Sequence, residues 1–265
     1  MLEFLNYNFM INALLAILLL SPMYALLGTM VVDSKMSFFS EALGHSALTG
    51  VAIGVALGFG DPVVATVIFG VLFALGINQV KKRGRASSDT IISVFSSAAI
   101  SLGLVLLSKG GNFAKYSSLL VGDIMSVTKS EIFTLLCAMV VIFAVWVPIF
   151  NRLMLVGINR SLAKSRNINV ALVENLFMVM VAVLVTLSIT RVGALIINSM
   201  LVLPAASSRN LARSTAQYHA ISAVIGLVCG VCGLVLSFYL NTTAGATIVL
   251  LMAAVYFISL LFTKK

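Results

Sequence analysis

Two residues that could bind a metal ion lie one helical turn apart in the segment SFFSEALGHSALTGVAIG, residues 37–54. They are Glu41 and His45, and nearly all their neighbours are apolar or small. Side chains four residues apart lie on the same face of an α-helix. A carboxylate oxygen and an imidazole nitrogen at this spacing are suitable ligands for a divalent transition metal.

Three interpretations of this pair are open from the spacing alone. The first is a site for a metal ion in transit, because two ligands are too few for tight tetrahedral binding and the ion must also leave. A symmetric dimer would double the number of ligands to four. The pair could instead relay protons, or form a structural hydrogen bond between packed helices. Gly50, Gly54 and Gly58 fall on another face in a small-xxx-small pattern, which predicts close approach of a second helix there. The face with Glu41 and His45 is then free to line a cavity or pathway.

The composition places the element that carries this pair in a lipid bilayer. Of the 265 residues, 61% are hydrophobic and only 9% are charged, and the mean hydropathy is +1.14. An ordinary soluble domain is about one quarter charged. The net charge of +9 indicates basic cytoplasmic loops and no nucleic-acid partner. An ionisable residue in a membrane segment is costly, so the pair is a functional candidate.

Nine apolar segments are long enough, or nearly so, to cross a hydrocarbon layer of about 30 Å as helices. They are 4–32, 38–60, 62–80, 90–108, 132–151, 175–190, 192–208 and two helices in 214–263 separated at 241–245. We therefore predict an all-α, polytopic integral membrane helical bundle with about 8–9 transmembrane helices. Arg191 is the expected hinge before 192–208, and a re-entrant segment there would change the number. The whole chain, 1–265, is expected to form a single membrane domain.

The basic residues predict which loops face the cytoplasm. With nine spans and the N-terminus outside, thirteen of the 17 basic residues are inside, at positions 35, 81, 82, 83, 85, 152, 160, 164, 166, 209, 213, 264 and 265. Such an excess marks the cytoplasmic side and predicts a cytoplasmic C-terminus. Of the two long connections, the outer one at 109–130 is expected to form a short interfacial helix. The inner one at 151–174 is basic and is expected to contain a short cytoplasmic helix.

Four segments resemble a known family. They are MSFFSEALGHSALTGVAIG, KYSSLLVGDIMSVT, VGALIINSMLVLPAASSRNLARS and NTTAGATIVLL. Similar segments occur in the same order in the membrane permease subunits of bacterial ABC importers for zinc, manganese and iron. The resemblance covers Met36 to about Leu251, and it is greatest to the zinc-uptake permeases.

The resemblance implies a multi-pass protein of the bacterial inner membrane with several partners. These are a second permease copy (a homodimer), a cytoplasmic ABC ATPase dimer and an extracytoplasmic metal-binding protein. Zn²⁺, or alternatively Mn²⁺ or Fe²⁺, would be the transported substrate, with no permanently bound cofactor. The chain contains no G-x-x-x-x-G-K-[ST] sequence, so ATP hydrolysis belongs to a separate subunit and this chain is not itself an enzyme.

The resemblance also implies roles for particular residues. The family has Asp-x-x-x-His along its metal path, and those positions are Glu41 and His45 here. Glu in place of Asp keeps the carboxylate but lengthens its reach by one methylene. Zinc permeases of this family also carry a His before an ALSLGL segment, where this chain has Ser96 and Ser97.

The inner loop of the family reads Asp-x-Ala with a later Gly and docks on the ATPase. In this chain the matching segment is SLAKSRN, so residues 158–168 are expected to form the coupling helix. Ser161, Leu162, Ala163 and Arg166 are the candidate coupling residues. Arg166 stands where the family usually has an acidic residue. The groove of the partner ATPase is therefore expected to carry a different charge.

Two other functional classes make different predictions. A proton-coupled secondary metal transporter would use Glu41 and His45 as a relay and would need no ATPase. Internal repeats are typical of that class, and the sequence shows no convincing one. A structural membrane scaffold would tolerate apolar residues at both positions.

Overall fold

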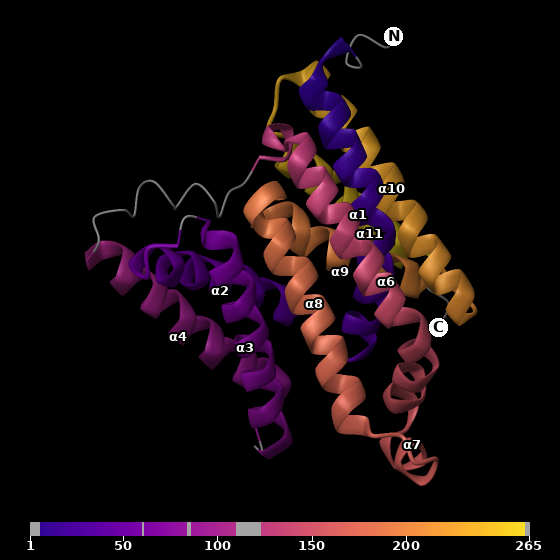
Figure 1. The fold of residues 1–265 in the computed structure, drawn as a ribbon. Coiled ribbons are helices and arrows are strands. Elements are labelled where there is room, and N and C mark those ends of the chain that lie inside the picture. Colours follow the sequence, from indigo (N-terminus) through magenta and orange to yellow (C-terminus); the bar gives the residue numbers. More distant parts are fainter. Residues whose placement is uncertain (1–5, 60, 84–85, 110–122, 263–265) are drawn as a thin grey trace. The chain divides into compact units, whose positions relative to one another are not determined.

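The computed structural model describes residues 6–59, 61–83, 86–109 and 123–262, and all regular structure in these ranges is helical (Figure 1). This confirms the predicted all-α helical bundle. The α-helices are α1 (Asn8–Asp33), α2 (Phe38–Ala56), α3 (Pro62–Arg83), α4 (Ser88–Lys109), α6 (Lys129–Ile158), α7 (Arg160–Ser165), α8 (Val170–Val192), α9 (Ala194–Leu211), α10 (Thr215–Leu240) and α11 (Ala244–Leu260). A short 3-10 helix, η2, covers Ile124–Ser126.

Each of the nine predicted spans corresponds to one helix, but the helices differ in apolar length. Among the described residues, six helices are long and apolar enough to cross a membrane: α1, α3, α4, α6, α8 and α10. Helix α11 is a shorter apolar helix. Helices α2 and α9 are interrupted by polar residues, so crossing by these two stays a prediction.

The chain forms two compact units. Unit 1 comprises residues 1–32, 119–139 and 188–265, and unit 2 comprises residues 33–118 and 140–187. Two of the boundaries between the units, after residues 139 and 187, fall within the long helices α6 and α8. The expectation that residues 1–265 act as a single membrane domain stays a prediction.

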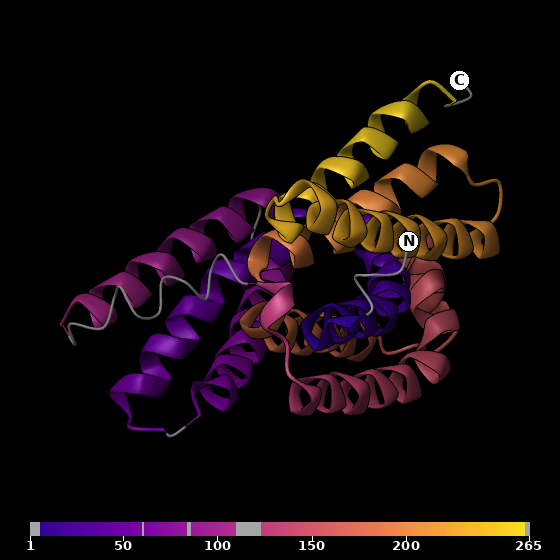
Figure 2. The same ribbon diagram turned by 90° about the horizontal axis from the view of Figure 1, so that it is seen from above.

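In unit 1, helix α1 packs closely on α9 and α10. A Cβ atom on Gly28 of α1 would clash with the main-chain carbonyl of Leu201 in α9. Thr29 Oγ1 lies 2.7 Å from Nδ1 of His219 in α10, within hydrogen-bond distance. Helices α9, α10 and α11 also pack on one another, and Figure 2 shows α11 crossing beside α10.

In unit 2, helix α2 packs against both α3 and α4, which Figure 1 shows together in purple. A Cβ on Gly50 would lie 2.5 Å from Cα of Thr66 in α3, so the predicted close approach of a second helix occurs here. On the α4 side, Thr49 Oγ1 donates a hydrogen bond of 2.5 Å to the carbonyl of Ala99. Gly58 does not belong to this packing stripe. It follows the end of α2 with φ +73° and open space around it, so it serves the turn.

The connections differ from the sequence expectations in two ways, and a third expectation is left largely untested. Helix α6 continues to Ile158, so residues 151–158 are helical and the inner connection is shorter than predicted. The break before α9 lies at Gly193, with φ +100°, because glycine adopts a positive φ without the steric cost of a side chain, whereas Arg191 is still part of α8. The interfacial helix expected in 109–130 lies largely outside the described residues.

Helix α6 also contains a contact between two aromatic rings. The ring of Trp146 lies 5.5 Å from the ring of Phe150, and Trp146 is buried.

Candidate functional site

Glu41 and His45 form the exposed part of an otherwise buried helix segment. Between residues 39 and 52, every residue of α2 except these two is buried. The side chains of Glu41 and His45 are 56% and 42% exposed, respectively. The structure therefore places the two predicted residues next to each other. Together they form the exposed strip of α2.

The two side chains are too far apart for a direct hydrogen bond. His45 Nε2 lies 3.9 Å from Glu41 Oε1, which is beyond hydrogen-bond range. A tetrahedral zinc ion about 2.1 Å from each atom would need them about 3.4 Å apart. Within the described residues, no third His, Cys, Asp or Glu joins the pair to complete a metal-binding group.

The rotation of α2 about its axis is fixed by its packing, and this directs the pair outward. Gly50 meets α3 and Thr49 bonds to α4, so those two faces are occupied. Ser46 satisfies its hydroxyl within α2 by donating to the carbonyl of Leu43 at 2.8 Å. The polar groups that remain outside this packing are the Glu41 carboxylate and the His45 imidazole.

A second charged pair, in unit 1, links the start of α6 to the end of α8. Arg191 Nη1 donates to Glu131 Oε1, and both side chains are mostly buried. The other oxygen, Glu131 Oε2, accepts a hydrogen bond of 2.8 Å from the backbone N–H of Thr128 and caps α6. Sequence reasoning missed this ion pair. The Thr-x-x-Glu pattern at 128–131 is a capping-box signal that could have located the carboxylate but not its partner.

Replacing Arg191 with alanine is expected to lower the free energy of unfolding by about 2 kcal/mol, because Glu131 would stay mostly buried without its cation. The measurement is the thermal unfolding midpoint of the purified protein in detergent. Lys129→Ala is the control, since it removes a neighbouring exposed cation outside this pair. An equal, small shift in both variants would contradict a stabilising role for the ion pair.

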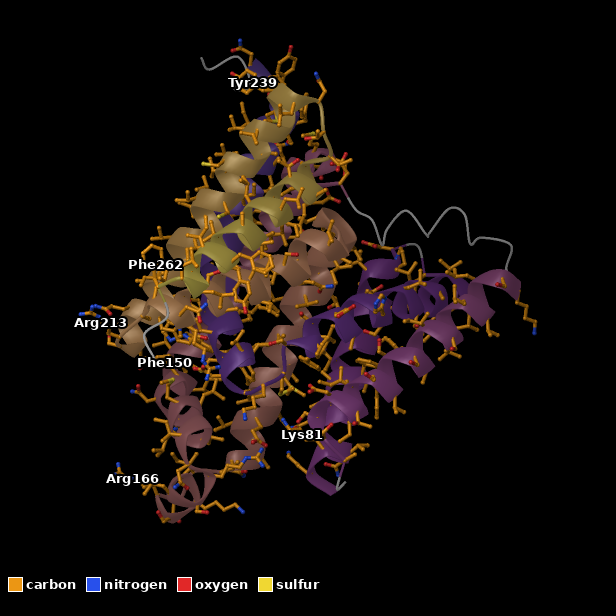
Figure 3. All side chains as sticks on the ribbon, turned by 180° about the vertical axis from the view of Figure 1, so that it is seen from behind. Lys81, Phe150, Arg166, Arg213, Tyr239 and Phe262 are labelled. Carbon is orange, nitrogen blue, oxygen red and sulfur yellow. The ribbon has the colours of Figure 1, made fainter. Side chains whose placement is uncertain are left out.

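The predicted coupling residues lie on α7 and just after it. Asn159 Oδ1 accepts hydrogen bonds from the backbone N–H groups of Ser161 (2.9 Å) and Leu162 (3.1 Å) and so caps the helix. Leu162 is 44% exposed, whereas Ala163 is fully buried and cannot contact a partner directly. Arg166 is exposed at the helix end, and Figure 3 shows its side chain pointing away from the ribbon.

Comparison with known proteins relates this architecture to membrane transport. The ABC 3 transport family matches residues 6–263 of the chain. The chain is 28% identical to the high-affinity zinc uptake system membrane protein ZnuB of Haemophilus influenzae, covering 96% of this chain and 97% of that protein. It is 24% identical to the manganese transport system membrane protein MntC of Listeria monocytogenes, covering 98% and 93%.

A solved structure agrees with these matches. PsaBC from Streptococcus pneumoniae, in complex with Fab, has a chain with a TM-score of 0.84 and 28% identity, covering 97% of this chain and 94% of that one. The membrane-bundle fold and the resemblance inferred from four segments are thus confirmed, and so is a role in transport rather than enzymatic chemistry. With the family match spanning residues 6–263, this membrane protein belongs to the ABC 3 transport family.

Proposed function

We propose that this chain is the permease subunit of an ABC importer that moves a divalent transition metal into the bacterial cytoplasm. The observation that carries this proposal is the strip on α2. Its two exposed residues between positions 39 and 52 are a carboxylate and an imidazole, 3.9 Å apart. Ionisable residues in membrane segments commonly mark ion pathways.

A second copy of the chain completes the ion path in this proposal. One chain supplies two ligands at this strip, and a two-fold axis beside it would bring four together. Four ligands from two movable helices can hold an ion briefly and release it when the helices separate. This suits transit better than a closed structural site does.

Zn²⁺ is the proposed substrate, with Mn²⁺ and Fe²⁺ as the alternatives. The general affinity order for nitrogen and oxygen ligands places zinc above both manganese and iron. Relatives named for zinc and for manganese are similarly close in sequence, so the proposal for zinc rests on this chemistry. The resemblance implies Asp at position 41, and the longer Glu41 side chain is expected to alter the selectivity among these metals.

The partners follow from membership of the family. An extracytoplasmic metal-binding protein delivers the ion to the outer mouth, and two cytoplasmic ABC ATPases drive the change between outward-facing and inward-facing states. The work enters through residues 158–168, with Ser161, Leu162 and Arg166 at the contact and Ala163 packed behind them. The excess of basic residues in the predicted inner loops supports an N-terminus outside and a C-terminus inside.

The proposal is tested by measuring ⁶⁵Zn and ⁵⁴Mn uptake into vesicles that contain the permease, its ATPase and its binding protein. We expect Zn²⁺ uptake that requires ATP and persists when an ionophore collapses the proton gradient. Uptake that needs the gradient but not the ATPase would contradict the proposal and favour the proton-coupled transporter, with Glu41 and His45 as its relay. A catalytically inactive ATPase serves as the control.

A further inference from the structure

In unit 2, the end of α3 meets the start of α8 in a polar cluster. Asn78 Nδ2 of α3 donates a hydrogen bond of 2.5 Å to Asn175 Oδ1 of α8, and Lys82 Nζ donates one of 3.2 Å to the same oxygen. Further along α3, a Cβ atom on Gly70 would clash with Cγ2 of Thr186 in α8. These contacts show that the two helices are antiparallel neighbours, so the cluster is held between two packed elements.

The cations of this cluster outnumber the carboxylates near them. Lys81 is half-buried, and Figure 3 shows it at the end of α3 on the side of α8. The charged groups that act on Lys81 are Arg160, Glu174 and Asp89. Arg160 is already paired with Glu174. Within the described residues, no carboxylate lies at ion-pair distance from Lys81 or Lys82. One further negative charge would therefore balance the cluster.

The cluster lies at the depth of the lipid headgroups. Residues 62–80 contain no charged side chain, and as a helix they extend about 29 Å, close to the hydrocarbon thickness of about 30 Å. Lys81 and Lys82 follow directly, at the boundary of the hydrocarbon. Val80 of α3 and Leu172 near the start of α8 are 41% and 49% exposed, so apolar surface adjoins the cations. This combination fits a ligand with one anionic group and a hydrocarbon chain.

We propose that the end of α3 and the start of α8 bind an anionic phospholipid of the inner leaflet, with its phosphate at Lys81 and Lys82. Asn175 Nδ2 is the neutral donor of the site, because Oδ1 of that side chain already accepts two hydrogen bonds. The acyl chains run along Val80 and Leu172. Basic pockets between transmembrane helices on the cytoplasmic side are typical binding sites for such headgroups.

Other cations on the predicted inner side of unit 2 lack this setting. Arg152 of α6 and Lys164 of α7 are both exposed. In the described part of the chain, neither forms an ion pair with a carboxylate. They carry the same charge as Lys81 and Lys82 without a second helix packed beside them at the cluster. They therefore provide a matched control for binding that depends on charge alone.

The test adds dioleoylphosphatidylglycerol to the full-length permease in detergent and counts bound lipid by native mass spectrometry. We expect the wild type to bind this lipid about tenfold more tightly than dioleoylphosphatidylcholine. Lys81→Gln/Lys82→Gln is expected to remove this preference, because each cation near a headgroup contributes to binding. Lys82→Gln alone alters only an exposed side chain, and it is expected to lose part of the preference even if the double variant is unstable. The control Arg152→Gln/Lys164→Gln is expected to bind as the wild type does.

Three results would overturn the inference. Equal losses in the two double variants would show that the lipid responds to net charge and not to this cluster. Displacement of the lipid by glycerol 3-phosphate at equal concentration would assign the cluster to a water-soluble phosphate compound. An unchanged preference for phosphatidylglycerol in Lys81→Gln/Lys82→Gln and in Lys82→Gln would remove the lipid site, and a simultaneous loss of affinity for an ATPase would assign these cations to a protein partner. Each of these results leaves the proposed metal transport intact, because the lipid site does not depend on it.

Discussion

Replacing Glu41 with glutamine is expected to reduce Zn²⁺ uptake at least about tenfold while the protein still assembles in the membrane. Glutamine has nearly the same size but lacks the negative charge, so the proposed ion pathway would lose its anionic ligand. Because Glu41 is exposed, its replacement leaves no cavity in the packing of α2. The measurement is ⁶⁵Zn accumulation in a zinc-starved host that expresses the permease with its ATPase.

Two further substitutions separate ligand chemistry from packing at this site. Glu41→Asp is expected to keep substantial uptake, because it retains the carboxylate. His45→Ala is expected to be as damaging as Glu41→Gln, since both groups lie on the same strip. Loss of zinc uptake alone, with manganese uptake intact, would identify zinc as the physiological ion. Unchanged uptake in His45→Ala would show that His45 is not a ligand.

Replacing Gly28 with alanine is expected to destabilise unit 1 by about 3 kcal/mol. The new Cβ would meet the main-chain carbonyl of Leu201, and a backbone atom cannot move aside as a flexible side chain can. Helices α1 and α9 would have to separate over the length of their contact. The measurement is the thermal unfolding midpoint, together with the yield of monodisperse protein on size-exclusion chromatography.

The matched control is Gly157→Ala. Gly157 is also helical, near the end of α6, but a Cβ there meets no atom within 4 Å. Alanine favours the helix by up to about 1 kcal/mol over glycine, so this variant should be neutral or slightly more stable. Equal stability of the two alanine variants would contradict the close contact between α1 and α9.

The helices themselves could be predicted from the sequence because the bilayer leaves few alternatives. A chain segment in hydrocarbon must satisfy its backbone groups internally, so an apolar run of sufficient length forms a helix. Where the helices leave the bilayer, this constraint no longer applies. The apolar run therefore predicted an end near residue 151, whereas α6 continues to Ile158.

The site could be located from the sequence, but its surroundings could not. The i, i+4 spacing placed Glu41 and His45 on one face of a helix, and only coordinates show that their neighbours are buried. Periodicity also assigned Gly58 to the packing stripe, since the pattern is the same for a packing glycine and for one that follows a helix end. Contacts between distant segments, such as Arg191 with Glu131, leave no pairing signal in a single sequence.

The burial of Trp146 gives the protein a built-in optical reporter. It is the only tryptophan in the chain, it is 4% exposed, and its ring is close to that of Phe150 on the same helix. When the isolated permease is excited at the red edge of tryptophan absorption, its intrinsic fluorescence therefore originates from Trp146 in α6. A change in that emission when a tryptophan-free ATPase binds nucleotide would follow the movement of this helix through the transport cycle without any attached dye.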